Sequence, residues 1–269
     1  MTVNPAPQTV IKLTGVTTRF GQHVVHRDLD LSVVQGEILS IVGGSGSGKT
    51  TLLRQMLGLD RPTGGKIEVL GRALSELTSE QLNALRRHSG VLFQRGALFS
   101  ALTVAENVAF PLRELRTFDE ELIREMTLKR LEMVGLSRAD GSKMPAELSG
   151  GMIKRAALAR ALALEPRVVF LDEPTAGLDP ESSEAFVELI RELHRELQLT
   201  VVMVTHDLDT LIALSDRIAV LADQRVIVAG PIQEVVKIAH PFIQTYFLAG
   251  RGRRALSALS TPAAAIANF

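Results

Sequence analysis

Eight consecutive residues near the start of the chain have the types and spacing that hold a polyphosphate. The segment Gly43–Thr50 matches the pattern Gly-x-x-x-x-Gly-Lys-Ser/Thr at every fixed position. Backbone N–H groups of such a loop point at phosphate oxygens, Lys49 reaches the outer phosphates, and the Thr50 hydroxyl is a ligand for Mg²⁺. A chance match in a chain of this length has odds of roughly one in a hundred. The sequence therefore predicts a nucleoside triphosphate site formed by Gly43, Gly44, Ser45, Gly46, Ser47, Gly48, Lys49, Thr50 and Thr51.

A pair of carboxylates is the second feature able to do chemistry. The apolar run Val168–Leu171 ends in Asp172 and Glu173. A carboxylate at the end of a buried strand costs desolvation free energy unless it faces a cation, and Mg²⁺ beside Thr50 would be that cation for Asp172. Glu173, one residue further on, is then placed to polarise an attacking water. Two acids at a strand end are more often an ordinary surface turn, so this interpretation depends on the phosphate-binding loop upstream.

The elements that must position these residues are predicted to form an α/β domain. Ile38–Val42 reads as a buried strand before the loop and Thr51–Leu57 as a helix after it, while Val10–Val34 alternates like a short antiparallel sheet. Helical periodicity extends from Thr103 to about Leu164. Alternating strands and helices then resume, with Val168–Leu171, Pro180–Leu197, Thr200–Val204, Asp207–Leu214 and Arg217–Leu221. The pattern predicts a nucleotide-binding core interrupted by a helical insertion near residues 96–160.

Helix boundaries are marked by capping residues. Thr78 precedes Gln81 by three positions and Thr103 precedes Glu106 in the same way, which is the spacing of a capping box. Further helix ends are indicated by Asp119, Ser149 and Gly135, the first two as N-caps and the glycine as a C-terminal stop.

Composition restricts the partners. Thirty basic and thirty acidic residues cancel, so no overall charge favours nucleic acid. There is no cysteine, which excludes disulfides and cysteine-ligated zinc and suits a reducing compartment. The segment Met1–Gln8 lacks the features of a signal peptide. No apolar run approaches the ~20 residues that a membrane-spanning helix needs. We therefore expect a soluble chain that takes part in any membrane process through a partner.

A third motif is the segment Leu148–Met152 at the start of a long helix. Ser149 followed by two glycines is a common helix start, but a helix N-terminus without side chains also binds anions. Taken together with the phosphate-binding loop and the pair Asp172 and Glu173, this motif makes residues 10–245 closely resemble the ATP-binding cassette family. The resemblance implies an α/β fold in which a P-loop NTPase core carries a small antiparallel β subdomain and a helical subdomain of about residues 96–160. It also implies ATP hydrolysis with ATP and Mg²⁺ as cofactors.

The resemblance assigns roles that single residues could not. Phe20 matches the aromatic residue that stacks on adenine, Gln94 matches the glutamine that senses Mg²⁺ and the attacking water, and His206 matches the switch histidine. It further implies that Ser149, Gly150 and Gly151 contact the nucleotide of a second copy, to which Asp179 also contributes. The catalytic set is then Lys49, Gln94, Glu173 and His206, and the metal ligands are Thr50, Gln94 and Asp172.

Within the family, the chain looks like the subgroup that energises Mla/Mce-type lipid transport. This likeness lies in Met152, in Gly90–Phe99 and in Val108–Glu114. Two departures from the general family pattern are Met152 in place of glutamine and Gly44 in place of proline, and neither removes a required donor. Alternatives are a cassette for import of amino acids or other small solutes, a soluble cassette acting on nucleic acid or ribosomes, and a phosphate-loop kinase.

The same resemblance implies partners and a location. It implies a second copy in a head-to-tail nucleotide-sandwich dimer and an integral permease, docked on Gly96–Arg113. A small regulatory subunit and a periplasmic lipid-binding protein are further implied partners, and nucleic acid is not one. The chain is then expected at the cytoplasmic face of the inner membrane, held there by the permease. We expect three parts: an N-terminal segment 1–9, the ATPase domain 10–245 and a C-terminal extension 246–269 that contacts a partner subunit.

Overall fold

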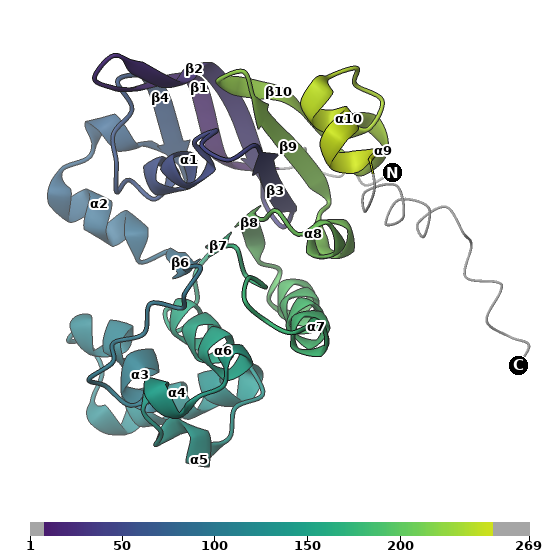
Figure 1. Cartoon of the computed structure of the whole chain (residues 1–269). Coiled ribbons are helices and arrows are strands. Elements are labelled where there is room, and N and C mark those ends of the chain that lie inside the picture. Colours follow the sequence, from purple (N-terminus) through teal and green to yellow (C-terminus); the bar gives the residue numbers. More distant parts are fainter. Residues whose placement is uncertain (1–7, 250–269) are drawn as a thin grey trace, which may run out of the picture.

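Two β-sheets form the framework of the computed structural model, which describes residues 8–249 (Figure 1). The antiparallel sheet has the order β2-β1-β4-β5, and the larger sheet has the order β10-β9-β3-β8-β7-β6. Neighbouring strands of the larger sheet run parallel from β9 to β6, and β10 is antiparallel to β9. The strands are β1 Thr9–Phe20, β2 His23–Val34, β3 Ile38–Gly43, β4 Gly64–Val69, β5 Arg72–Ala73, β6 Ser89–Leu92, β7 Val168–Asp172, β8 Thr200–Val204, β9 Arg217–Ala222 and β10 Arg225–Gly230.

The helices fall into groups that differ in their place around the sheets. α1 lies near the antiparallel sheet, α3–α6 form a helical lobe below β6 and β7, and α9 and α10 lie beside β10 (Figure 1). Their bounds are α1 Lys49–Met56, α2 Ser79–Arg86, α3 Val104–Glu114, α4 Glu120–Met133, α5 Arg138–Gly141, α6 Gly150–Ala161, α7 Pro180–Leu197, α8 Leu208–Leu214, α9 Ile232–Val235 and α10 Pro241–Phe247, with short 3₁₀ turns at Leu74–Glu76 and Pro145–Glu147.

The predicted helix ends are confirmed by the caps. Thr78 and Thr103 each form a complete capping box, which satisfies two otherwise unpaired N–H groups at the helix start. Asp119 accepts from Leu122 N, and Ser149 accepts from Met152 N. Gly135 follows α4 with a φ of 72°, the left-handed conformation that glycine adopts at low cost. Local sequence therefore fixes where these helices start and stop.

Two large cores hold the layers together. One lies between the sheets and includes Ile11, Leu39, Leu53 and Phe170, so the antiparallel sheet and α1 are packed on the parallel sheet. The other joins the helical lobe to the opposite face of the parallel sheet. Its fully buried members come from α3, α4, α6, α7 and the strands, among them Val104, Ala157, Leu171, Phe186 and Met203. Because α6 shares this core with β7, the helical lobe is not an independently packed unit.

The fold class expected from the sequence is confirmed. Two strands were not predicted: β5, which pairs with β4 in the antiparallel sheet, and the edge strand β10. The expected boundary after residue 245 falls inside α10, whose Ile243 and Phe247 are fully buried. The extension expected to contact a partner subunit comprises residues 246–269, of which 250–269 lie outside the described part. Among the described helices, none combines the length and apolar character required to cross a membrane.

Candidate nucleotide site

Four neighbouring parallel strands bring the sequence-predicted residues to one edge of the larger sheet. β3, β8, β7 and β6 are adjacent, and their carboxyl ends lead into Gly43, His206, Glu173 and Gln94. Open α/β sheets bind ligands at this edge, because the loops that leave the strands gather there. Residues separated by up to 163 positions in the chain (206 − 43) thus surround one site.

The phosphate-binding loop is shaped by close backbone approach at two glycines. A Cβ at Gly43 would lie 2.4 Å from the Leu221 carbonyl oxygen, and one at Gly48 would lie 2.4 Å from His26 Nε2. Gly48 has a φ of 93° and is the N-cap of α1, with no side chain to accept from the helix start. The first N–H groups of α1 are therefore left to an external acceptor, as an anion site requires.

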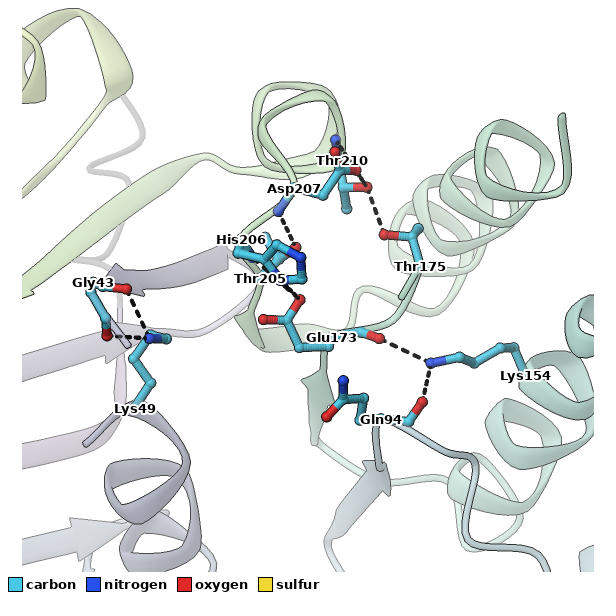
Figure 2. A network of polar contacts seen from close by, with 11 residues as sticks. Gly43, Lys49, Gln94, Lys154, Glu173, Thr175, Thr205, His206, Asp207 and Thr210 are labelled. Carbon is cyan, nitrogen blue, oxygen red and sulfur yellow. Dashed lines mark hydrogen bonds and ion pairs between the residues drawn. The ribbon is translucent and has the colours of Figure 1, made fainter. Parts of the chain in front are cut away.

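Lys49 provides the positive charge of the loop. Its Nζ donates to the carbonyl oxygens of Gly43 at 2.8 Å and Gly44 at 2.9 Å, which holds the amine over the loop (Figure 2). Burial lowers the pKa of Lys49, whereas the charges of Glu173 and Asp172 act in the opposite direction. An ammonium group and several unpaired N–H groups thus converge on the same space, which suits a polyphosphate.

Beneath the loop lies a buried polar cluster that sequence reasoning missed. Thr18, His26 and Gln55 come from β1, β2 and α1, and all are at most 2% exposed. Gln55 Nε2 lies 2.9 Å and His26 Nδ1 3.1 Å from the Thr18 hydroxyl. Burial lowers the pKa of His26, and the Gly48 backbone opposes this change. The cluster supports the loop from below, since His26 limits the space at Gly48.

Glu173 and His206 form the closest polar contact between two predicted catalytic residues. His206 Nδ1 lies 2.8 Å from Glu173 Oε2, and the His206 backbone N–H donates to the same oxygen at 3.2 Å (Figure 2). Glu173 has a φ of 51°, a left-handed conformation that costs a non-glycine residue about 1–3 kcal/mol. The surrounding strands hold it there, since its N–H donates to the Val204 carbonyl at 2.8 Å. The carboxylate is thus fixed at the edge where β7 ends.

Asp172 has the environment of a cation ligand. Burial raises the pKa of its carboxyl and the charge of Glu173 adds to that rise, while Lys154 and Lys49 oppose it. Among residues 8–249, Asp172 takes part in no ion pair. No described cluster of three or more His, Cys, Asp or Glu side chains could hold a metal by itself. These facts fit Mg²⁺ held by few protein groups together with phosphate oxygens, as Thr50, Gln94 and Asp172 were predicted to do.

Two further predicted residues lie at the rim of the site. Gln94 follows β6 and is exposed, while its carbonyl oxygen accepts from Lys154 at 2.6 Å. Phe20 ends β1 and is 59% exposed, on the hairpin whose His26 lies against Gly48. The exposed aromatic ring at the end of this hairpin strand is available to stack on a base. Its role in stacking stays a prediction.

The structure does not bring the Leu148–Met152 motif to the phosphate loop of the same chain. Ser149 caps α6, and the start of this helix lies against the loop before α7 and the first turn of α7. A Cβ at Gly150 would lie 3.5 Å from Leu178 Cδ2, and one at Gly151 would lie 3.8 Å from Ser182 Cβ. Asp179 accepts from Ser182 N at 2.9 Å and caps α7, and these hydrogen bonds lower its pKa. Figure 1 shows α6 well separated from α1. The predicted nucleotide contacts therefore form two groups, only one of which faces Lys49.

Comparisons with known proteins show which family and which relatives the chain is similar to. The family model described as ABC transporter matches residues 26–176. The intermembrane phospholipid transport system ATP-binding protein MlaF of Haemophilus influenzae is 41% identical over 86% of this chain and 87% of its own length. The methionine import ATP-binding protein MetN of Ralstonia nicotianae is 43% identical over 84% of this chain and 65% of its own length.

A solved structure agrees with the fold and adds a ligand. A dimeric ATP-binding cassette in a post-hydrolysis state, bound to ADP and Pi, has a TM-score of 0.75 and 34% identity. The match covers 82% of this chain and 98% of that chain. That protein was therefore solved as a dimer holding the products of ATP hydrolysis, and its fold is the fold described here.

Proposed function

The chain belongs to the ABC transporter ATPase family, and on that premise we propose that it powers phospholipid transport between bacterial membranes through a partner permease. It binds ATP with Mg²⁺ and hydrolyses ATP, as its family does. The observation that carries the lipid assignment is the similarity to MlaF, which extends over nearly the whole length of both chains. Met152 in the motif at the start of α6 supports it.

We assign the hydrolytic roles from the geometry at the sheet edge. Glu173 accepts a proton from the attacking water, because its carboxylate is fixed at the end of β7 and faces the space beside Lys49. His206 holds that carboxylate by its 2.8 Å contact. Lys49 and the first N–H groups of α1 stabilise charge on the phosphates, and Mg²⁺, when bound, neutralises part of the same charge.

A second copy completes the site in this proposal. Ser149, Gly150 and Gly151 lie at the exposed start of α6, a helix that is well separated from α1 and the phosphate loop before it (Figure 1). In a head-to-tail dimer, the symmetry that brings the α6 start of one copy to the loop of the other does so twice, which gives two equal sites. Asp179 and Ser182 lie beside the α6 start and belong to the same contact surface.

An exposed aromatic patch supports the permease as partner. Phe99 and Phe110 are 46% and 37% exposed, with ring centroids 4.8 Å apart, and Arg160 lies 5.8 Å from the Phe99 ring centre. They line a groove of about 340 Å³ together with Phe93 and Pro111. Large exposed apolar side chains around a groove fit an apolar partner segment. Docking here would hold the chain peripherally at the cytoplasmic face of the inner membrane.

The expected docking segment is only partly exposed. Leu98 packs against the core of the helical lobe, and Leu102 is half-buried, so Phe99 and Phe110 are the residues to test. Replacing both by serine should abolish co-purification with the permease while nucleotide affinity stays unchanged. Loss of the folded state instead would assign these rings to the core.

The lipid assignment is tested by purifying the chain with its permease and analysing bound small molecules by mass spectrometry. Phospholipid retained by the complex, and ATP turnover that rises with added phospholipid, is the expected result. The similarity to MetN favours methionine import as the second candidate. A complex free of lipid whose turnover rises with methionine would support that candidate and reject ours. A small regulatory subunit and a periplasmic lipid-binding protein are expected in the same purification.

A further inference from the structure

A lysine of α6 is buried without a carboxylate partner at the catalytic edge, by which we mean the sheet edge that carries Gln94, Glu173 and His206. Lys154 is 4% exposed, although lysine is among the residue types that are almost never fully buried unless paired. No described acidic side chain forms an ion pair with it. Burial lowers the pKa of Lys154 to about 8, and the charges of Glu173 and Asp172 oppose that change.

Both hydrogen bonds of the Lys154 amine go to residues of the hydrolytic site. Nζ donates to the main-chain carbonyl of Gln94 at 2.6 Å and to that of Glu173 at 2.9 Å (Figure 2). These carbonyls lie just beyond the ends of β6 and β7, which are neighbours in the sheet. One amine thus fixes the separation between the backbone that carries the proposed base and the backbone that carries the proposed water-sensing glutamine.

The same helix holds the Gln94 segment at a second point. Arg160, six residues after Lys154, donates to the carbonyls of Gly96 and Ala97, each at 2.8 Å. Two cationic side chains of α6 therefore fasten both ends of residues 94–97. Ser149–Gly151 form the cap and first turn of α6. Any rotation of this helix therefore moves these residues together with the attached segment 94–97.

Filling of the core does not explain the choice of lysine. Ala156, Ala157 and Leu158 follow on the same helix and fill the core shared with β7 without polar groups. An ammonium group placed there loses its hydration, and only well-placed acceptors offset that loss. The acceptors present are the carbonyls of Gln94 and Glu173, so the position of the amine is set by the catalytic edge.

We infer that Lys154 is a positioning residue, which fixes Gln94 and Glu173 relative to each other and to the start of α6. The inference rests on the proposed roles of Glu173 and Gln94 in hydrolysis. Docking at the groove, closure over the α6 start and placement of the attacking water are thereby linked through α6, with Arg160 at the groove and Lys154 at Gln94 and Glu173. Errors of about 1 Å in such placement can lower a rate by as much as 10²-fold.

The test compares three variants of the full chain. Lys154→Met removes both hydrogen bonds, Lys154→Arg keeps a cation with donors, and Arg155→Met is the matched control. Arg155 is the next residue of α6 and donates to the Val134 carbonyl at 2.7 Å, away from Gln94 and Glu173. The measurements are kcat and KM for ATP, affinity for a fluorescent ATP analogue without Mg²⁺, and the thermal midpoint.

Lys154→Met should lower kcat about 10-fold or more, with KM and analogue affinity within twofold of the wild type. Lys154→Arg should recover most of the rate. Arg155→Met should lower the thermal midpoint while leaving kcat within twofold. If Lys154→Met does not fold, Lys154→Gln, which keeps a donor without the charge, should show the same selective fall in kcat.

Several results would overturn the inference: an unchanged kcat in Lys154→Met, an equal loss of kcat in Arg155→Met, or no recovery with arginine. Failure of the proposed function is recognised separately. Normal turnover in Glu173→Gln would reject the base, whereas an inactive Glu173→Gln beside a fully active Lys154→Met would reject the role of Lys154 alone.

Discussion

The starts of α1 and α6 are both glycine-rich turns into a helix, yet they differ in what they offer an anion. Gly48 caps α1 without a side chain, and Lys49 follows at once as a half-buried cation. At α6 the hydroxyl of Ser149 accepts from Met152 N at 3.3 Å, and no cation occurs in the first turn. Only the α1 start is a complete phosphate site within one chain.

This difference explains why one chain is half of a working unit. The α6 start offers the N–H groups of Gly150 and Gly151 and a hydroxyl, which add to a phosphate site but do not form one without a cation. In addition, α6 is well separated from α1, the helix that begins at Lys49 (Figure 1). The α6 start lacks a cation. Lys49 of a second copy would supply it, if that copy presents the nucleotide bound at its own α1 start.

The largest effect should come from Glu173, because its side chain serves ATP hydrolysis but not nucleotide binding at the α1 start. Glu173→Gln removes a proton acceptor but no phosphate contact, so kcat should fall by about 10²–10⁴-fold. Affinity for ATP should stay within threefold, and an ATP-bound dimer should accumulate. Steady-state turnover and gel filtration with ATP measure both. Near-normal turnover would remove Glu173 from its role.

Lys49→Ala should damage the α1 start itself. The ammonium forms charge-assisted hydrogen bonds with the outer phosphates, each worth about 1.5–3 kcal/mol. Affinity of the single chain for ATP should therefore fall about 10- to 100-fold. Titration with a fluorescent nucleotide measures this directly. Unchanged affinity would place the phosphates elsewhere.

Ser149→Ala should damage only the α6 start. Loss of the cap destabilises the chain by about 1 kcal/mol, which a denaturant titration would detect. Nucleotide affinity of the single chain should stay as in the wild type, while turnover at concentrations that allow dimers should fall several-fold. If Ser149→Ala weakened nucleotide binding by the monomer as Lys49→Ala does, the contrast between the two helix starts would be lost.

The smallest effect should come from His26, which lies against Gly48, and it concerns the free energy of unfolding. Burial lowers the pKa of His26, so the unfolded chain binds a proton more readily than the folded chain. Stability should therefore be unaffected above the ordinary value of 6.5 and decrease as pH falls below it, by at most about 1.4 kcal/mol per pH unit. His26→Leu should remove this component of the acid-induced loss.

The measurement is the free energy of unfolding between pH 7.5 and 5.0, with His23→Leu as control. His23 is an exposed histidine on the same strand. An acid response of His26→Leu equal to that of the wild type would show that the His26 side chain is accessible to protons in the folded state.

Much of the fold could be predicted because its signals are local. Capping boxes at Thr78 and Thr103 fixed helix starts, and apolar runs that end in polar motifs indicated parallel strands. The edge strand β10 was missed for a physical reason: it shows no alternation of buried and exposed residues. Its turn from β9 uses Asp223 and Gln224 at positive φ, so no glycine marks it.

From the residues alone, the site could be predicted only where a motif is continuous in sequence; the isolated residues Phe20, Gln94 and His206 were predicted through the family resemblance. Lys154 and His26 were missed because their partners are distant along the chain: Lys154 contacts residues 60 and 19 positions away. A lysine on a helix is expected at the surface, and a histidine in a strand has no distinctive neighbours. Only the folded structure shows that both are buried beside the nucleotide site.

The central claim is that Ser149 serves the nucleotide held by Lys49 of another copy, and mixing two inactive variants tests it most directly. Lys49→Ala and Ser149→Arg chains are purified separately, shown to be inactive alone, and mixed in equal amounts with the permease. Half of the randomly formed dimers then carry one of each and retain one intact site, so turnover should reach about one quarter of the wild type. Turnover no higher than that of either variant alone would contradict the account.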